Sequence, residues 1–203
     1  MKIAIDTNGV LRDTLGKAEQ VYQKFFIDDY IQEEGEEDFE YKLNLPITSM
    51  NLIDHFVFPK TEDLYDFLYV DFPMNIFGHA ASVSANTFNV VNEIYEDLRD
   101  DHEISIISDE IQKSKPATLF FLSKYGCLVE KINFYSKITM NDVISEYDVV
   151  ITANPDILED ENFKMKKVKF NTSYNENINS EYTINNLEQF KELYEELKLK
   201  ENV

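Results

Sequence analysis

The sequence predicts an α/β fold: a parallel sheet of about five strands flanked by helices, with a small helical cap inserted after the first strand. Segments rich in β-branched and aromatic residues alternate with segments of helical periodicity, which is typical of βαβ units. Residues 7–102 separate the first predicted strand from the second, whereas a simple crossover needs only about thirty residues. The additional residues predict an inserted unit. The predicted strands are residues 2–6, 103–108, 131–135, 148–152 and 168–171.

The inserted unit is expected to cover residues 15–83, and the core residues 1–14 and 84–203. The first helix of the insertion is predicted at residues 15–32. An acidic segment follows at residues 33–40, which we interpret as a solvated loop. Aromatic residues are frequent in the rest of the insertion. We expect them to form its apolar core rather than a platform on which bases stack.

Three helices of the core are indicated by apolar residues that recur with helical period. The first covers residues 88–98, and the second contains Leu119. The clearest stripe lies in residues 187–197. Just before it, Asn186 and Gln189 resemble a capping box, because they are three residues apart at the start of the stripe.

The charge balance limits the partners of the chain. Its 203 residues include 39 Asp and Glu but only 19 Lys and Arg, which gives a formal net charge of −20. Such a field repels phosphate backbones and anionic lipid headgroups, so we expect no direct binding to nucleic acid and none to membranes. If a phosphorylated ligand binds, a bound cation and a few placed donors must attract it.

Cysteine content and hydropathy indicate a location. Cys127 is the only cysteine, which excludes an internal disulfide bond and a thiolate metal cluster. No apolar run approaches the ~18 residues that a membrane span requires. We therefore expect a cytoplasmic protein. The composition, rich in Asn, Ile, Lys, Tyr and Glu, would also suit a phage, and a phage protein of this kind would lie within the virion.

Residues capable of chemistry follow the carboxyl ends of the predicted strands, where an open α/β sheet binds its ligand. Asp6 ends the first strand and precedes an Asn-Gly turn, which is how a carboxylate nucleophile is presented. Ser108 ends the second strand. A helix opens soon afterwards, with Lys113 and Lys115 near its N-terminus. A lysine there would neutralise both Asp6 and a transferring phosphoryl group. We favour Lys115, and the spacing leaves Lys113 open.

Three stretches of the chain resemble a known family. The segment 2–13, KIAIDTNGVLRD, resembles motif I of the phosphohydrolases of the haloacid dehalogenase (HAD) superfamily. Residues 106–126 resemble the 5'(3')-deoxyribonucleotidase branch, as do residues 149–158 followed by 168–175. The insertion does so too, because that branch keeps a small helical cap there. The resemblance implies a HAD-like core, an aspartyl-phosphate formed on Asp6, and Mg²⁺ as cofactor if the chain is active.

The resemblance also implies roles for single residues. Ser108 would be motif II, which donates a hydrogen bond to a phosphoryl oxygen, and Lys115 would be motif III. Asn8 stands where phosphatases of the family carry a second Asp, the general acid and base. An amide can neither take nor return that proton, a contribution typically worth ~10² to 10⁴ in rate.

Motif IV departs from the pattern of the family. The nucleotidase branch ends this strand in two consecutive Asp residues that bind Mg²⁺ together with the motif I carboxylate. Thr152 and Ala153 stand at those two places here. Because Mg²⁺ prefers several hard oxygen ligands in near-octahedral geometry, Asp6 alone makes a poor site. Asp156, four residues past Thr152, is the best remaining candidate for a second metal ligand.

Two functional hypotheses follow. In the first, the chain is a catalytically inactive HAD-fold protein with a binding or structural role. Its retained Asp6, Ser108 and Lys115 would hold an anion, a nucleotide or a side chain of a protein partner. In the second, it is a Mg²⁺-dependent (deoxy)nucleoside 5'-monophosphate phosphohydrolase, in which Asp6 attacks phosphorus and Asp156 completes the metal site. We favour the first, because both the acid/base and a metal carboxylate are missing.

Overall fold

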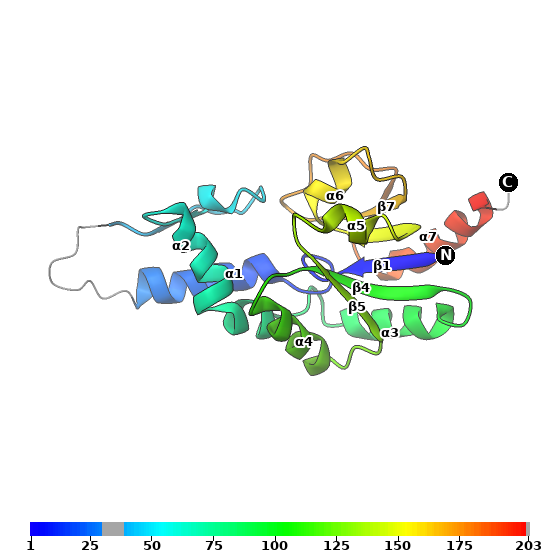
Figure 1. Ribbon diagram of the computed structural model, residues 1–203, viewed down its shortest axis with the longest axis horizontal. Coiled ribbons are helices and arrows are strands. Elements are labelled where there is room, and N and C mark those ends of the chain that lie inside the picture. The colour runs from blue at the N-terminus through cyan, green and yellow to red at the C-terminus, as the bar shows by residue number, and fades with distance from the viewer. Residues whose placement is uncertain (30–38, 202–203) are drawn as a thin grey trace.

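The computed structural model describes residues 1–29 and 39–201, so most of the predicted acidic loop lies outside the described residues. Its centre is a sheet of six parallel strands in the order β5-β4-β1-β6-β7-β8 (Figure 1). The predicted parallel α/β architecture is therefore confirmed. The strands are β1 (Lys2–Asp6), β4 (Glu103–Asp109), β5 (Lys131–Tyr135), β6 (Val149–Thr152), β7 (Lys166–Phe170) and β8 (Tyr182–Ile184).

Alternation along the strands explains why helices cover both faces of the sheet. In β1, Ile3 and Ile5 point into the larger apolar cluster, which also holds residues of α3, α4 and α7. Ala4 points to the opposite face, into a smaller cluster that contains residues of α5 and α6. The core helices are α3 (Thr87–Leu98), α4 (Ser114–Lys124), α5 (Met140–Ile144), α6 (Pro155–Glu159) and α7 (Glu188–Glu201).

The sixth strand, β8, was not predicted, because three residues are too few to show a period. It lies at the edge of the sheet, next to β7. The predicted cap of α7 is confirmed in part. Asn186 Oδ1 accepts a hydrogen bond from the Gln189 backbone N–H at 3.1 Å, whereas Gln189 Oε1 accepts from the backbone of Asn185 at 2.6 Å, one residue earlier than in a capping box.

Between β1 and α3 the chain leaves the sheet and forms a separate layer, which projects to the left in Figure 1. We call residues 15–29 and 39–83 of this layer the cap segment. Besides helices it contains a two-stranded antiparallel ribbon, which was not predicted. Its elements are α1 (Thr14–Tyr22), η1 (Gln23–Asp28), β2 (Lys42–Leu43), η2 (Leu52–Asp54), β3 (Phe56–Val57), α2 (Thr61–Asp66), η3 (Phe67–Asp71) and η4 (Met74–Gly78).

Aromatic side chains fill the interior of the cap segment, as expected. Tyr22 on α1 is fully buried, and its ring lies 5.4 Å from that of Phe56 and 5.7 Å from that of Phe67. The cluster also contains Ala117 of α4, so the cap segment is packed onto a core helix. The first predicted helix, residues 15–32, is α-helical to Tyr22 and continues as a π-helix to Asp28, and its residues 30–32 lie outside the described residues.

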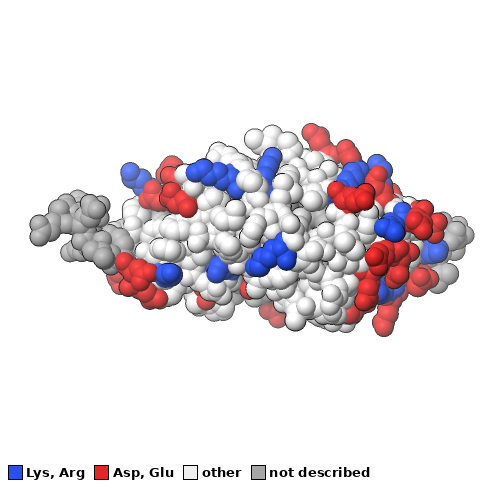
Figure 2. All heavy atoms as spheres, turned by 90° about the horizontal axis from the view of Figure 1, so that it is seen from below, with Lys and Arg blue, Asp and Glu red and all other residues white. Residues whose placement is uncertain are grey.

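The charges are distributed unevenly over the surface. On the face that Figure 2 shows, acidic side chains gather toward both ends of the molecule, and the middle carries few of them. Across the part of the chain that the structure describes, no helix has both the length and the hydropathy that crossing a bilayer would require.

Candidate functional site

A cavity of about 760 Å³ lies at the carboxyl ends of the strands, beneath the cap segment. We call it the cap–core cleft. This is the position at which an open α/β sheet binds its ligand. The cleft is lined from the core by residues that include Asp6, Asn8, Gly9, Asp13, Asp109, Tyr135, Asn154, Phe170 and Tyr174. From the cap segment it is lined by residues that include Leu15, Glu19, Ile47, Met50, Leu68, Tyr69, Phe77 and Val83.

Asp6 lies at the centre of the core side and is only 1% exposed. Its Oδ2 accepts a hydrogen bond from Thr152 Oγ1 at 2.7 Å and a longer one from the Tyr135 hydroxyl at 3.3 Å. Its Oδ1 has no hydrogen-bond partner in the described residues. One carboxylate oxygen is therefore held by the protein, and the other has no partner of its own.

Burial raises the pKa of Asp6 from 3.8 to about 7. The hydrogen bond from Thr152 opposes this shift, and the neighbouring Asp109 carboxylate adds to it. Burial, followed by the charges of Glu110 and Asp156, likewise raises the pKa of Asp109 to about 6. Two adjacent carboxyl groups with raised pKa values in one cavity are typical of a functional site.

Asn8 lines the cleft, but its side-chain amide is engaged in hydrogen bonds. Its Oδ1 accepts hydrogen bonds from Arg12 Nη2 at 2.7 Å and from Thr14 Oγ1 at 2.6 Å. Its Nδ2 donates to the backbone oxygen of Asp109 at 3.4 Å. Its amide group therefore serves as a structural link between the loop after β1 and the end of β4.

Arg12 is fully buried beneath this loop and forms an ion pair with the equally buried Glu110. Its Nη1 donates to Thr118 Oγ1 on α4 at 2.6 Å and to the backbone oxygen of Phe77 in the cap segment at 3.0 Å. The guanidinium also lies over the Phe77 ring, 5.0 Å from its centroid. The ion pair thus joins β1, β4, α4 and the cap segment at one point.

Ser108 belongs to the same network and not to the cleft. It is fully buried, and its Oγ donates to Glu110 Oε1 at 3.1 Å. It is not among the residues that line the cleft. The structure therefore gives the predicted phosphoryl donor another acceptor, the Glu110 carboxylate.

The two candidate lysines lie at the exposed start of α4, outside the cleft lining. Lys113 Nζ donates to the backbone oxygen of Val70 in the cap segment at 3.1 Å. Lys115 Nζ lies 5.7 Å from the centroid of the Phe134 ring. Neither makes a hydrogen bond or ion pair with Asp6 in the described residues. Indeed, the residues that line the cleft include no Lys, Arg or His.

The donor groups near Asp6 do not fit the Mg²⁺ site that the resemblance implies. Asp156 is exposed on α6 and outside the cleft lining, although its charge reaches Asp109. Thr152, at the position of one of the two expected acids, offers a hydroxyl that donates to Asp6 Oδ2. Across residues 1–29 and 39–201, no group of three or more His, Cys, Asp or Glu side chains could hold a metal ion. Hard cations require several such oxygens.

Several residues of the site were missed or left without a role by the sequence reasoning. Tyr135 ends β5 and donates a hydrogen bond to Asp6, and Tyr174 follows β7 and lines the same cleft. A Cβ added to Gly9, whose φ is +77°, would lie 2.0 Å from the Tyr174 hydroxyl oxygen. Asn175 fixes this approach, because its Nδ2 donates to the backbone oxygen of Ala153 at 3.0 Å. In the sequence, the available indication of the role of Tyr174 was the Tyr174-Asn175 pair just after the last predicted strand.

Solved structures with this fold are HAD-like hydrolases. A HAD-like hydrolase from Burkholderia xenovorans matches with a TM-score of 0.56 and 11% identity over 96% of both chains. A dehalogenase with an intermediate complex matches with a TM-score of 0.53 and 10% identity over 95% of this chain and 96% of that one. A further dehalogenase gives 0.50 and 10% identity, with the same coverage. No family model and no curated protein matches the chain.

These likenesses establish the fold of the chain as that of HAD-like hydrolases, and identities of 10% and 11% establish no more than the fold. The chemistry has to be argued from the cleft.

The buried ion pair should be costly to break from one side. We expect Arg12→Leu to lower the free energy of unfolding by about 3 to 5 kcal/mol, because it leaves the Glu110 carboxylate buried and unpaired. The combined Arg12→Leu, Glu110→Leu variant should lose less than the sum of the two single changes. Urea unfolding measures both. Lys131→Met, which removes a surface ion pair to Glu103, is the control and should cost less than about 1 kcal/mol.

The raised pKa of Asp6 should make the folded protein less stable at high pH. Because the folded state holds this proton more tightly than the unfolded state, the contribution to stability is complete below pH 3.8 and is lost as pH rises through about 7. Asp6→Asn removes this dependence. Above pH 7 the variant should therefore be more stable than the wild type, by up to about 4 kcal/mol at about 1.4 kcal/mol per pKa unit.

Urea unfolding between pH 4 and pH 8 would show the difference vanish toward the acid end. Asp100→Asn is the matched control, because Asp100 is exposed just before β4, at the opposite end of the sheet. Equal effects of the two variants at pH 8 would contradict the assignment of the shift to the burial of Asp6.

Proposed function

We propose that this chain is a non-hydrolytic binding protein with a HAD-like fold, and that the cap–core cleft is its ligand site. The hydrogen bond from Thr152 to Asp6 Oδ2, 2.7 Å long, is the observation that carries the proposal. Phosphoryl transfer through a metal would need an acid at the position of Thr152. A hydroxyl there binds the carboxylate itself and, unlike an acid, supplies no anionic oxygen to a metal.

Asn8 supports the same proposal. A general acid and base must lie within reach of the reacting group and exchange a proton with it. The amide of Asn8 has no exchangeable proton of suitable pKa, and its oxygen already accepts from Arg12 and Thr14. Replacing a catalytic Asp by this amide removes the proton shuttle and adds a link to the network around Arg12.

The charge of the cleft also opposes a phosphorylated ligand. Phosphate groups are usually held by Arg, Lys, a helix N-terminus or a metal ion. Asp6, Asp13, Glu19 and Asp109 line this cleft, and no basic side chain lines it with them. The nucleotide and the phosphate therefore become the less favoured ligands. A protein partner, and a place in the cytoplasm or in a virion, remain part of the proposal on the basis of composition alone.

The second candidate function is the Mg²⁺-dependent (deoxy)nucleoside 5'-monophosphate phosphohydrolase of the nucleotidase branch. One observation favours it: Asp6 lies at the carboxyl end of β1 under a cap segment, with an unpartnered Oδ1. That is where a nucleophile would have to be. The candidate requires a metal ligand and a phosphate donor from outside the residues that line the cleft.

Phosphate release separates the two candidates. Purified protein with Mg²⁺ and a panel of deoxynucleoside 5'-monophosphates should release phosphate no faster than the Asp6→Asn variant, because the acid/base and the second metal ligand are both missing. A coupled phosphate assay measures the rate. Release that depends on Asp6 and stops on addition of EDTA would establish the second candidate instead.

Thr152 should be the position that controls metal binding. Thr152→Asp places a second carboxylate beside Asp6, so we expect the dissociation constant for Mg²⁺ to fall at least about tenfold, as measured by calorimetry. Ala153, the other motif IV position, follows β6 and packs in the larger apolar cluster, so it is left unchanged. Thr152→Asn is the matched neutral control. Equal Mg²⁺ affinity of the folded Asp and Asn variants would show that this position does not face the metal site.

A further inference from the structure

We infer that the cap–core cleft binds an organic cation, an ammonium group carried on an apolar body. This inference deepens the proposed function and rests on its assignment of the cleft as a ligand site. It adds the chemical class of the ligand, which is argued from the charge, the aromatic faces and the size of the cleft.

The carboxylates of the cleft have no positive partner within its lining. Asp6 and Asp109 lie on its core side, and Glu19 on α1 lies half-buried on its cap side. Asp6 is 1% exposed, yet its Oδ1 has no hydrogen-bond partner. A buried acceptor without a donor is unfavourable unless a ligand supplies the donor. An ammonium group supplies up to three N–H donors together with the opposite charge.

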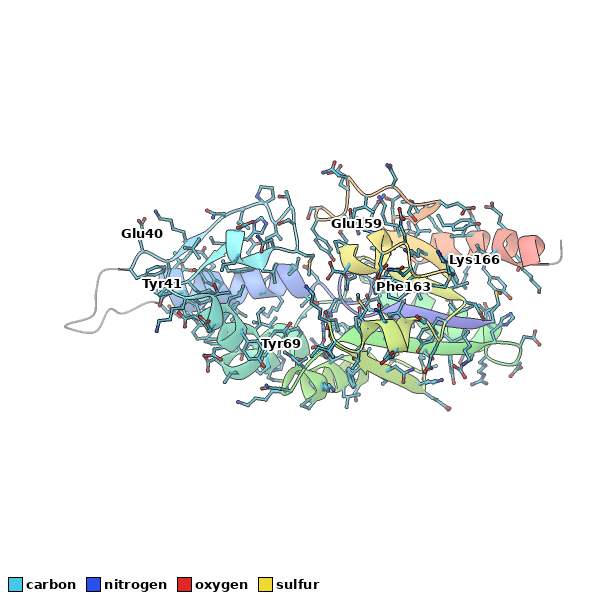
Figure 3. All side chains as sticks on the ribbon, turned by 45° about the horizontal axis from the view of Figure 1, so that its top comes forward. Glu40, Tyr41, Tyr69, Glu159, Phe163 and Lys166 are labelled. Atoms are coloured by element: carbon cyan, nitrogen blue, oxygen red, sulfur yellow. The ribbon has the colours of Figure 1, made fainter. Side chains whose placement is uncertain are left out.

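Aromatic rings lie beside these carboxylates. Tyr69, which Figure 3 labels on the cap segment near its junction with the core, stacks on Phe77 with 5.6 Å between ring centroids. Tyr174 lies over the Gly9 backbone on the core side. Aromatic faces attract ammonium groups through the ring quadrupole, and they do so most strongly where water is excluded. Carboxylates together with aromatic faces therefore favour a cation over a neutral ligand.

The remainder of the lining is apolar and suits an organic body. Ile47 and Leu68 of the cap segment line the cleft together with Phe170, the last residue of β7. A volume of about 760 Å³ lies within the range of sites for small organic molecules, roughly 300 to 1,000 Å³. A bare metal ion would leave these apolar walls in contact with water, and the described acidic residues do not form a metal cluster. An anion would meet only like charges.

Three probes of the same shape and different charge test the inference on the full chain: 4-phenylbutylammonium, 4-phenylbutanol and 4-phenylbutanoate. Calorimetry at pH 8 and low salt, above the pKa of about 7 of Asp6, measures each dissociation constant with this carboxyl group charged. We expect the ammonium probe to bind at least about tenfold more tightly than the alcohol, and the carboxylate to show no binding. Binding of the alcohol as tight as that of the ammonium probe, or binding of the carboxylate, would overturn the inference.

Charge-neutral variants locate the ammonium group. Asp6→Asn should weaken binding of the ammonium probe at least about fivefold, because it removes the buried partner. Asp100→Asn makes the same change at the exposed far end of the sheet and should leave the affinity within about twofold, because exposed charges at that distance are screened. Equal losses of affinity in the two variants would show that binding responds only to the net charge of the protein, which would overturn the inference. If circular dichroism shows that Asp6→Asn does not fold, Glu19→Gln on α1 takes its place, and the affinity of that variant for the ammonium probe is measured instead.

The inference and the proposed function fail in different ways. Phosphate release that depends on Asp6, together with selective binding of the ammonium probe, would refute the non-hydrolytic function and leave the ligand class standing. No phosphate release together with no preference for the ammonium probe would refute the ligand class alone.

Discussion

The ion pair between Arg12 and Glu110 is the interaction on which the organisation of the site depends. Both residues are buried, and their pairing compensates for part of the cost of removing two charges from water. Glu110 Oε2 has no hydrogen-bond partner among the described residues, whereas the N–H groups of the guanidinium need acceptors. The guanidinium therefore requires Asn8, Thr118 and the backbone oxygen of Phe77 as acceptors. Meeting these requirements holds the loop after β1, the helix α4 and the cap segment in one arrangement.

The same ion pair explains the acidity of the cleft above it. The guanidinium of Arg12, in the loop after β1, is paired with the buried Glu110 carboxylate, and the Ser108 hydroxyl donates to the same carboxylate. Lys113 and Lys115 lie on the outer surface of α4. What remains in the cleft is Asp6, bound on one oxygen by Thr152, among other carboxylates and aromatic rings. The part of the cleft that the structure describes therefore offers a phosphate no basic side chain.

The sequence predicted the strands well, because each is a run of β-branched or aromatic residues bounded by polar segments. It also predicted that Asp6 would end the first strand, since a strand that runs into an Asn-Gly turn is a local pattern. It could not place Tyr135 and Tyr174 beside Asp6, because those contacts depend on the order of the strands in the sheet. The burial of Arg12 was missed for a different reason: an arginine normally indicates a surface, and its partner Glu110 lies far along the chain.

The central claim is that Asp6 does not accept a phosphoryl group, and mass spectrometry tests it directly. The protein would be incubated with Mg²⁺ and acetyl phosphate, quenched in acid, and digested, so that a stalled aspartyl-phosphate is detected even without turnover. The account predicts that the peptide containing Asp6 keeps its unmodified mass, as it does in an Asp6→Asn sample treated in the same way. A gain of one phosphoryl group on Asp6 of the wild type would contradict it.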